Sequence, residues 1–252
     1  MKVINLYSGS SGNSTYIEID GMRFLVDAGW NAKALCSSLL SIGVSPDSID
    51  RIFVTHEHSD HISALPVFEK KHCVPVVISE VCSGCRTLCD AVPRDRMTVF
   101  RTPFSECFGG VKVTSFPVPH DSRECFGYRF DGSEGSLAVI TDIGIVTEDV
   151  KSAVRGCEYL ILESNYDPVM LSKSIYPPDL QSRILSPTGH LSNGDCGDFA
   201  RELSGSGLKK MLLAHISEHS NTPETAAETV KNRVGPSVTV IPTSHTAPTE
   251  LV

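Results

Sequence analysis

The sequence predicts an α/β fold with four layers, an α/β/β/α sandwich of two pseudo-symmetric halves, residues 1–125 and 126–252. Each half carries strands in succession and then strands that alternate with helices, an order typical of sheets covered by helices on their outer faces. Histidine and aspartate residues recur where the predicted strands end, which favours a site built at one edge of the sheets. No linker separates the halves, so we expect residues 1–252 to form a single domain.

The composition indicates a globular protein of a reducing compartment. The 252 residues are 40% hydrophobic and 21% charged, which is enough for a large core. No apolar run approaches the roughly 18–20 residues that a membrane span needs, and the first residues lack the features of a signal peptide. Nine cysteines, an odd number, oppose a disulfide framework. We expect a cytoplasmic protein without membrane contact, and no feature indicates its oligomeric state.

The net charge of −8 opposes a broad, non-specific nucleic-acid surface. A local phosphate site stays possible, because a pair of metal ions would itself supply positive charge.

Hydrophobic periodicity predicts the elements of residues 1–92. Asp20-Gly21 separates two alternating runs and predicts a hairpin. The Gly/Ser stretch 8–14 predicts either a plain turn or a loop whose backbone N–H groups approach an anion. Pro66 interrupts one helical pattern. The expected strands are 2–7, 15–20, 22–26, 51–54 and 74–78, and the expected helices are 31–42, 62–71 and 80–92.

The rest of the chain predicts further strands and helices in alternation. Ser192 or Asn193 is suited to cap a helix that runs to Leu203. The tail from Thr243 is polar, and we expect it to be frayed. The expected strands are 98–101, 111–118, 126–130, 137–141, 158–162, 209–213 and 238–241, and the other expected helices are 146–155, 177–185 and 223–230.

Three histidines and an aspartate lie within residues 56–61, directly after an apolar strand. Imidazole offers a neutral nitrogen and is the commonest metal ligand near neutral pH. In an extended loop His56 and His58 project to the same side and can hold one ion, whereas Asp60 and His61 can reach a second ion. The alternative is a polar loop that is merely rich in histidine, and the ligand-type spacing opposes it.

Four more polar residues follow predicted strands: Asp27, His120, Asp142 and His215. Side chains at strand ends are well placed to converge over a sheet. Asp27 is suited to orient a histidine through a hydrogen bond, with a turn or helix cap as the alternative. Turn residues are likewise the alternative for His120 and Asp142.

Cys82, Cys85 and Cys89 form a C-x2-C-x3-C pattern in the helix expected at 80–92. Such a pattern can bind a metal ion. On one helix face, however, cysteines more often serve as small core residues, and core packing is the interpretation we prefer.

These motifs follow the order of the metallo-β-lactamase fold superfamily, which the chain resembles over nearly its whole length through Thr55-His56-x-His58-x-Asp60-His61, His120, Asp142 and His215. More narrowly, it is similar to the YycJ/WalJ-type exonuclease family. The matching stretches are 8–14, 162–165, Tyr176-Pro177, 189–193, and 213–217 followed by Asn221-Thr222-Pro223.

The resemblance implies a dinuclear metal centre. It assigns His56, His58 and His120 to one ion, Asp60, His61 and His215 to the other, and Asp142 to a bridge between them. Two ions about 3.5–4 Å apart can share a hydroxide and clamp the attacking and leaving oxygens of a phosphodiester. Zinc suits the imidazole-rich set, and manganese or iron also fits because the set has two carboxylates and no thiolate.

The resemblance also implies catalytic roles downstream. Glu163 and the stretch 189–193 resemble loops of tRNA-processing phosphodiesterases of this fold, in which the matching histidine contacts the scissile phosphate. We therefore predict Asp60, His190 and Glu163 as catalytic residues, with Glu163 orienting His190. Ser192 and Asn193 are expected to donate to a phosphate oxygen. Tyr166 stands where the family usually has histidine, and it is assigned no role.

The sequence thus predicts a metal-dependent phosphodiesterase, a nuclease acting from an end of DNA in preference to RNA. A small-molecule phosphodiesterase or a glyoxalase-like thioester hydrolase on the same site is the first alternative. A metal-binding partner without turnover is the second, and seven ligands with a bridging carboxylate oppose it. A nuclease usually has a basic track, for which the candidates are Arg123, Arg129, Lys173 and Arg183.

Overall fold

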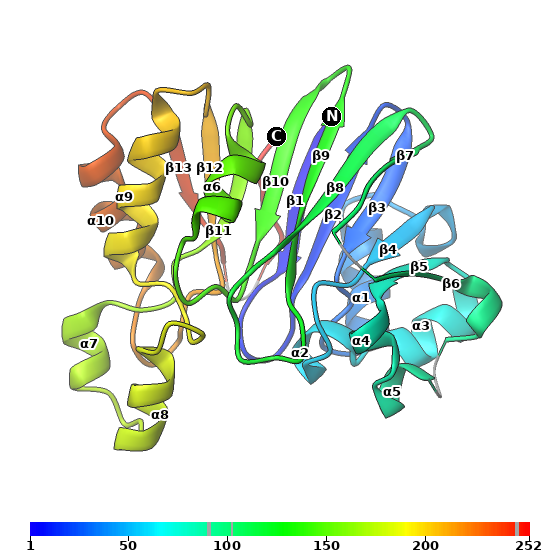
Figure 1. The fold of residues 1–252 in the computed structure, drawn as a ribbon, viewed down its shortest axis with the longest axis horizontal. Coiled ribbons are helices and arrows are strands. Elements are labelled where there is room, and N and C mark those ends of the chain that lie inside the picture. The colour runs from blue at the N-terminus through cyan, green and yellow to red at the C-terminus, as the bar shows by residue number, and fades with distance from the viewer. Residues whose placement is uncertain (90–91, 102, 245–246) are drawn as a thin grey trace.

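Two seven-stranded sheets pack against each other in the computed structural model, which describes residues 1–252 except 90–91, 102 and 245–246. Helices cover the outer faces of the sheets (Figure 1), so the layers have the predicted α/β/β/α order. None of the helices in the described part of the chain combines the length and the apolar character that crossing a membrane requires.

The first sheet has the strand order β14-β1-β2-β3-β4-β5-β6. Strands β1 to β3 pair antiparallel, and β3 to β6 pair parallel. The strands are β1 Lys2–Tyr7, β2 Ser14–Ile19, β3 Met22–Val26, β4 Arg51–Phe53, β5 Val76–Ser79, β6 Met97–Phe100 and β14 Thr249–Glu250.

The second sheet repeats this pattern in the order β13-β12-β11-β10-β9-β8-β7. Strands β7 to β10 pair antiparallel, and β10 to β13 pair parallel, so the pseudo-symmetry predicted from the sequence is confirmed. The strands are β7 Ser105–Phe108, β8 Val111–Pro117, β9 Phe126–Gly132, β10 Gly135–Ile140, β11 Tyr159–Glu163, β12 Lys210–Ala214 and β13 Thr239–Pro242.

Polar side chains begin several helices by accepting hydrogen bonds from backbone N–H groups, as Asn31, Thr147, Ser192 and Thr222 do. The helices beside the first sheet are α1 Ala32–Ser41, α2 Ser59–Ile62, α3 Leu65–His72, α4 Glu80–Ser83 and α5 Arg86–Cys89, with short 3-10 turns at Pro46–Ser48 and Arg94–Arg96. Those of the second half are α6 Glu148–Val154, α7 Pro168–Ser172, α8 Pro178–Ile184, α9 Asn193–Ser204 and α10 Pro223–Val234.

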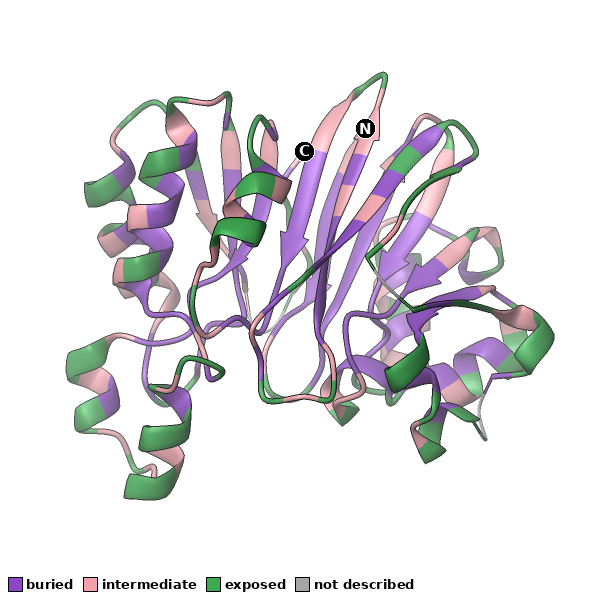
Figure 2. Ribbon diagram, in the orientation of Figure 1, coloured by how far each residue is buried: buried purple, intermediate pink, exposed green. Residues whose placement is uncertain are grey.

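Aromatic side chains join the two sheets at the centre of the molecule. Phe53 of β4 makes an edge-on contact with Phe24 and Phe130 and a tilted contact with Tyr128, with ring centroids 5.3–5.5 Å apart. All four side chains are fully buried, and Figure 2 shows the buried residues concentrated along the strands. Such pairs add about 0.5–1.5 kcal/mol each beyond area burial. This packing fixes the loops that follow the strands of both sheets relative to one another.

The boundary between the sheets differs from the predicted 125/126 division. The second sheet already begins at β7, and its first two strands precede residue 126. The polar residues of β7 are exposed, so the strand lacks the apolar alternation that predicts a sheet.

The prediction of one helix over residues 80–92 is wrong for the residues that the structure describes. It is broken at Gly84 into α4 and α5. Cys82 is buried in the core, Cys85 is half-buried and packs against that core, and Cys89 is exposed, so core packing holds for Cys82 and in part for Cys85. Within the described residues these three cysteines form no group with metal-ligand geometry.

The tail from Thr243 is not wholly frayed. Strand β14 pairs with β1 through Ile4 and Asn5, and Leu251 is buried. The polar sequence of this segment does not predict a strand, because the short edge strand forms only by pairing with β1. The helical pattern expected at 62–71 is interrupted near Pro66, because α2 ends at Ile62 and α3 begins at Leu65 with Pro66 in its first turn.

Candidate dinuclear metal centre

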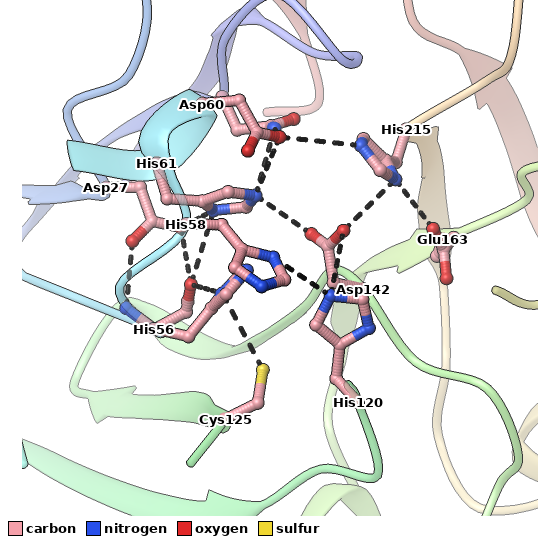
Figure 3. Close-up of polar contacts among 12 residues, drawn as sticks. Asp27, His56, His58, Asp60, His61, His120, Cys125, Asp142, Glu163 and His215 are labelled. Carbon is pink, nitrogen blue, oxygen red and sulfur yellow. Dashed lines mark hydrogen bonds and ion pairs between the residues drawn. The ribbon is translucent and has the colours of Figure 1, made fainter. Parts of the chain in front are cut away.

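The predicted ligands meet at one end of the two sheets (Figure 3), each just after a strand. This arrangement follows from the strand ends predicted by the sequence, because both sheets present their loops to the same cleft. Three histidines and an aspartate come from the loop and helix after β4, and the others follow β8, β10 and β12: His56, His58, Asp60, His61, His120, Asp142 and His215.

His56, His58 and His120 form the first cluster, with one ring nitrogen of each within 4.8 Å of the others. His58 Nδ1 lies 3.4 Å from His120 Nε2. His120 Nδ1 lies 3.2 Å from the Gly189 carbonyl oxygen and donates to it, which leaves Nε2 for the cluster. Burial holds the pKa of His56 well below its ordinary value, with His61 adding to the effect. His56 is therefore a neutral imidazole, the form that binds a metal ion.

Asp60, His61, Asp142 and His215 form the second cluster. His61 Nε2 lies 3.0 Å from Asp142 Oδ2 and 3.4 Å from Asp60 Oδ2. His215 Nδ1 lies 3.4 Å from Asp142 Oδ1, and His215 Nε2 lies 4.0 Å from Asp60 Oδ2. Asp142 also falls within ligand distance of His56, so its carboxylate stands between the two clusters.

Opposite charges in this cluster shift the ionisation of its members. Burial lowers the pKa of His61, but the carboxylates of Asp142 and Asp27 outweigh burial and raise it well above its ordinary value. Burial raises the pKa of Asp142, and the charges of His215 and His61 overcome this effect and hold it well below the usual range. The Asp142 carboxylate is therefore an anion.

Two ligand atoms lack the hydrogen-bond partners that buried polar atoms ordinarily have. His56 Nε2 and His215 Nε2 are buried, and among the described residues neither makes a hydrogen bond. Buried polar atoms without partners are rare and require an explanation. Divalent metal ions fit, because these atoms are imidazole nitrogens that lie beside the Asp142 carboxylate. The fold and this donor set imply divalent metal ions.

Asp27 and Thr55 fix the orientation of His61. His61 Nδ1 donates to Asp27 Oδ2 at 2.7 Å, so its Nε2 faces the cluster. Asp27 also accepts from the backbone N–H and the hydroxyl of Thr55, both at 2.8 Å. A carboxylate that holds a ligand histidine in this way fixes its tautomer and its ring orientation.

Glu163 holds two histidines through one oxygen. Its Oε1 accepts from His190 Nδ1 at 2.8 Å and from His215 Nδ1 at 2.7 Å. Its Oε2 accepts from the backbone N–H groups of Ile143 at 2.9 Å and Leu191 at 3.1 Å. Burial lowers the pKa of His190, but Glu163 outweighs burial and raises it above the ordinary value. The contact with His190 was expected from the sequence, and the contact with His215 was not.

Three residues of the site have a left-handed backbone. Asp27, Asp142 and His215 have φ values of 63°, 53° and 54°. Left-handed backbone costs roughly 1–2 kcal/mol in residues other than glycine and collects at functional sites. The strained backbone at these three residues therefore sets the direction of their side chains.

Sequence reasoning missed two amide side chains. Asn13 Nδ2 lies 3.1 Å from Asp60 Oδ2 and 3.0 Å from His61 Nε2, and Asn165 Nδ2 donates to the His215 carbonyl at 2.8 Å. Asn13 belongs to the Gly/Ser stretch 8–14, which we considered only for anion binding. The signal that could have found Asn13 was the resemblance of this stretch to the exonuclease family.

The side chains of Ser192 and Asn193 are engaged in hydrogen bonds within the protein and do not face the cleft as free donors. The Ser192 hydroxyl accepts from Asp195 N and donates to the Asp195 carboxylate. Asn193 is fully buried, accepts from the Ser164 hydroxyl and exchanges hydrogen bonds with Asn221. Because these side chains are occupied, we do not propose either as a substrate contact.

A cleft of about 450 Å³ opens over the two clusters, and His190 and Arg183 are among its walls. Arg183 Nη2 donates to Asp121 Oδ1 at 3.1 Å, and this contact lowers the pKa of Asp121. Of the four basic candidates, Arg183 is the one that lines the cleft in the described structure. Arg129 instead donates to Asp131 and to backbone carbonyls, so its guanidinium is engaged away from the cleft.

Tyr166 lies outside the cleft walls. Its ring is buried with Leu171 and Ile184 under α7 and α8, and its carbonyl oxygen accepts from Asn193 N at 2.9 Å. This residue supports the α7–α8 segment and takes no part in the metal clusters of the described chain.

Known proteins match this architecture and this site. Residues 22–216 match the model of the Beta-lactamase superfamily domain. The chain is 35% identical over 226 residues to exodeoxyribonuclease YycJ of Bacillus anthracis, covering 89% of this chain and 86% of that protein. It is 34% identical over 233 residues to exodeoxyribonuclease WalJ of Streptococcus pneumoniae, covering 91% and 86%.

Among solved structures, the metallo-β-lactamase fold protein YhfI of Bacillus subtilis superimposes with a TM-score of 0.74 at 17% identity, covering 99% of this chain and 98% of that one. At this identity the likeness concerns the fold alone. The family match, the two relatives and the His/Asp clusters agree with one another. The chain therefore belongs to the Beta-lactamase superfamily, has the metallo-β-lactamase fold of metal-dependent hydrolases and resembles YycJ and WalJ.

Proposed function

We propose that this chain is a dinuclear-metal-dependent exodeoxyribonuclease. The observation that carries the proposal is the convergence of the histidine and aspartate ligands, among which His56 Nε2 and His215 Nε2 are buried without hydrogen-bond partners in the described chain, beside the Glu163–His190 pair. The names of YycJ and WalJ support DNA as the substrate in preference to RNA.

The proposed ligand assignment follows the two clusters. His56, His58 and His120 hold one ion, and Asp142 bridges it to the other, which Asp60, His61 and His215 hold. Two divalent ions bound there would lower the pKa of water to about 7 and neutralise charge on a phosphodiester. Zinc is our first choice of metal because five of the seven ligands are imidazoles, and manganese or iron is the alternative.

The chain's own residues supply orientation and a proton. Asp27 and Glu163 keep the Nδ1 protons of His61 and His215, respectively, so that each Nε2 faces the cleft. Glu163 also keeps His190 protonated on Nδ1 and raises its pKa, and the His190 ring lines the cleft. We propose that His190 donates its Nε2 proton to the leaving oxygen or stabilises its negative charge. We propose that Asp60, whose Oδ2 accepts a hydrogen bond from Asn13 Nδ2, orients the attacking water.

Few cationic side chains line the cleft in the described structure. This favours a nucleic acid that is bound near its end. Arg183 is engaged with Asp121, and the net charge of the chain is −8. A long basic surface for a duplex is not supported, and a small phosphodiester stays the second candidate. All nine cysteines are free thiols, which supports a location in the cytoplasm.

A substrate panel tests the function. Metal-loaded protein should degrade 5′-phosphorylated DNA from an end, and should act less well on RNA and on a thioester. The variant Asp142→Asn should retain less than the two ions per chain expected of the wild type and should lose turnover. Activity confined to the thioester, or undiminished cleavage by metal-free protein, would contradict the proposal.

A further inference from the structure

A second cavity adjoins the metal cleft. It has a volume of about 370 Å³. Ser10, Tyr176 and His219 line both hollows, so the two hollows are neighbours that share these side chains. A substrate held over the metal clusters would reach the second cavity by passing these three residues.

Aromatic side chains line part of this second cavity, beside residues 8–12 of the Gly/Ser stretch. Trp30, the sole tryptophan of the chain, lines it with 47% of its surface exposed. Tyr7 packs edge-on against Trp30, with ring centroids 5.5 Å apart. Tyr176 and His219 stand at 90° to each other, also with centroids 5.5 Å apart. Exposed rings around a hollow suit a flat aromatic ligand.

The backbone of Trp30 is held in an unusual conformation. Its φ is 57°, a value that is an outlier for a bulky residue. A Cβ on Gly12 would lie 2.6 Å from Trp30 Cβ, so glycine is required for the close approach of the two segments. The Ser63 hydroxyl donates to the Trp30 carbonyl. The exposed indole is thus presented by a built structure and is not a stray surface ring.

The same loops hold the cavity and the metal clusters. Ser8 Oγ accepts from His215 N at 2.7 Å, while Ser8 and Ser10 line the aromatic cavity. A Cβ on Gly29, next to Trp30, would overlap the Asp60 carbonyl oxygen. One layer of chain therefore separates Trp30 from the ligands.

Charge distinguishes the two spaces. The described walls of the aromatic cavity include the carboxylate of Glu218 and no lysine or arginine. Arg183, by contrast, lines the metal cleft. The positive charge favours a phosphate in the cleft, and the rings favour an aromatic group in the cavity.

We propose that this cavity is a base-binding subsite, in which Trp30 stacks on the nucleobase of a nucleotide next to the scissile phosphate while Tyr176 and His219 close its other side. The subsite rests on the proposed nuclease function. Stacking on an aromatic side chain tolerates every base, because each base has a π-face. The subsite therefore serves an exonuclease that degrades DNA without regard to sequence.

The single tryptophan provides a direct test. Metal-loaded protein is titrated with short 5′-phosphorylated single-stranded DNA whose phosphorothioate linkages resist cleavage. Binding is followed by anisotropy of a dye on the DNA, and stacking is followed by Trp30 fluorescence. Quenching of Trp30 should saturate together with anisotropy. Full saturation of anisotropy with unchanged Trp30 fluorescence would overturn the subsite.

Variants and abasic DNA make the test specific. In the wild type, removal of one base near the 5′ end should weaken binding by about tenfold, equivalent to about 1.4 kcal/mol. Trp30→Ala should bind intact DNA about tenfold more weakly and lose this discrimination, and Trp30→Phe should recover most of it. Leu40→Ala, which also removes an exposed apolar side chain, should behave as the wild type.

Trp30→Ala with wild-type affinity and discrimination would contradict the subsite while the nuclease proposal stands. A wild type that neither binds nor cleaves DNA would contradict both. If Trp30→Ala fails to fold, the wild-type titration and Trp30→Phe decide the question.

Discussion

Glu163 accepts a hydrogen bond from His215 at 2.7 Å through Oε1, the same oxygen that holds His190. A proposed metal ligand and a proposed proton donor thus depend on one buried carboxylate. We therefore expect metal binding and proton transfer to be coupled through this oxygen, so that a change at Glu163 affects both.

The variant Glu163→Gln should lose metal affinity, activity and stability together. Four N–H groups point at the two carboxylate oxygens, and the NH₂ group of glutamine must face some of them. We expect a loss of about 1–3 kcal/mol in the free energy of unfolding, measured by denaturant titration. Glu158→Gln, in an exposed ion pair with Lys209, is the matched control and should change stability by less than about 1 kcal/mol. Equal stability of the two variants would contradict this role.

Asp27→Asn should weaken metal binding by about 10–100-fold, the usual cost of removing a carboxylate that orients a ligand histidine. An asparagine cannot accept from both Thr55 and His61 through two oxygens, so the ring of His61 loses its fixed orientation. Competition with a fluorescent chelator measures the affinity. Asp131→Asn, a carboxylate paired with Arg129 of the same strand, β9, should leave it unchanged.

His190→Ala should keep its metal ions and cleave DNA roughly 100-fold more slowly or worse. If His190 supplies a proton, the loss depends on the leaving group. It should be smaller for bis(p-nitrophenyl) phosphate, because nitrophenolate leaves without protonation. An equal loss on both substrates would assign His190 to charge stabilisation, and no loss on either would remove it from the mechanism.

Metal uptake should release protons. Burial lowers the pKa of His215 in the metal-free chain, but Asp142 and Glu163 outweigh burial and raise it to about 9. At pH 7 the free His215 is therefore protonated, and metal binding requires the neutral Nε2. The apparent metal affinity should rise with pH up to about 9. Calorimetry in buffers of different ionisation enthalpy measures the protons released, and uptake without release would contradict the assignment.

The ligand set could be predicted because His56, His58, Asp60 and His61 share one short stretch and the other ligands follow apolar strands. Strand β7 could not be predicted, since its polar face is exposed, and β14 depends on pairing with a strand about 245 positions earlier in the chain. The contact of Glu163 with His215 joins residues 52 apart. Sequence periodicity describes only local patterns, so it cannot predict a contact between residues that are far apart in the chain.

The left-handed backbone at Asp27, Asp142 and His215 bears on protein engineering. Glycine is the residue that such φ values favour, but these side chains also make buried hydrogen bonds and ion pairs that glycine would remove. Libraries for a more heat-resistant enzyme should therefore keep these three codons fixed. Glycine at Asp142 should serve instead as a diagnostic variant, in which relief of backbone strain offsets part of the lost contacts while activity is lost completely.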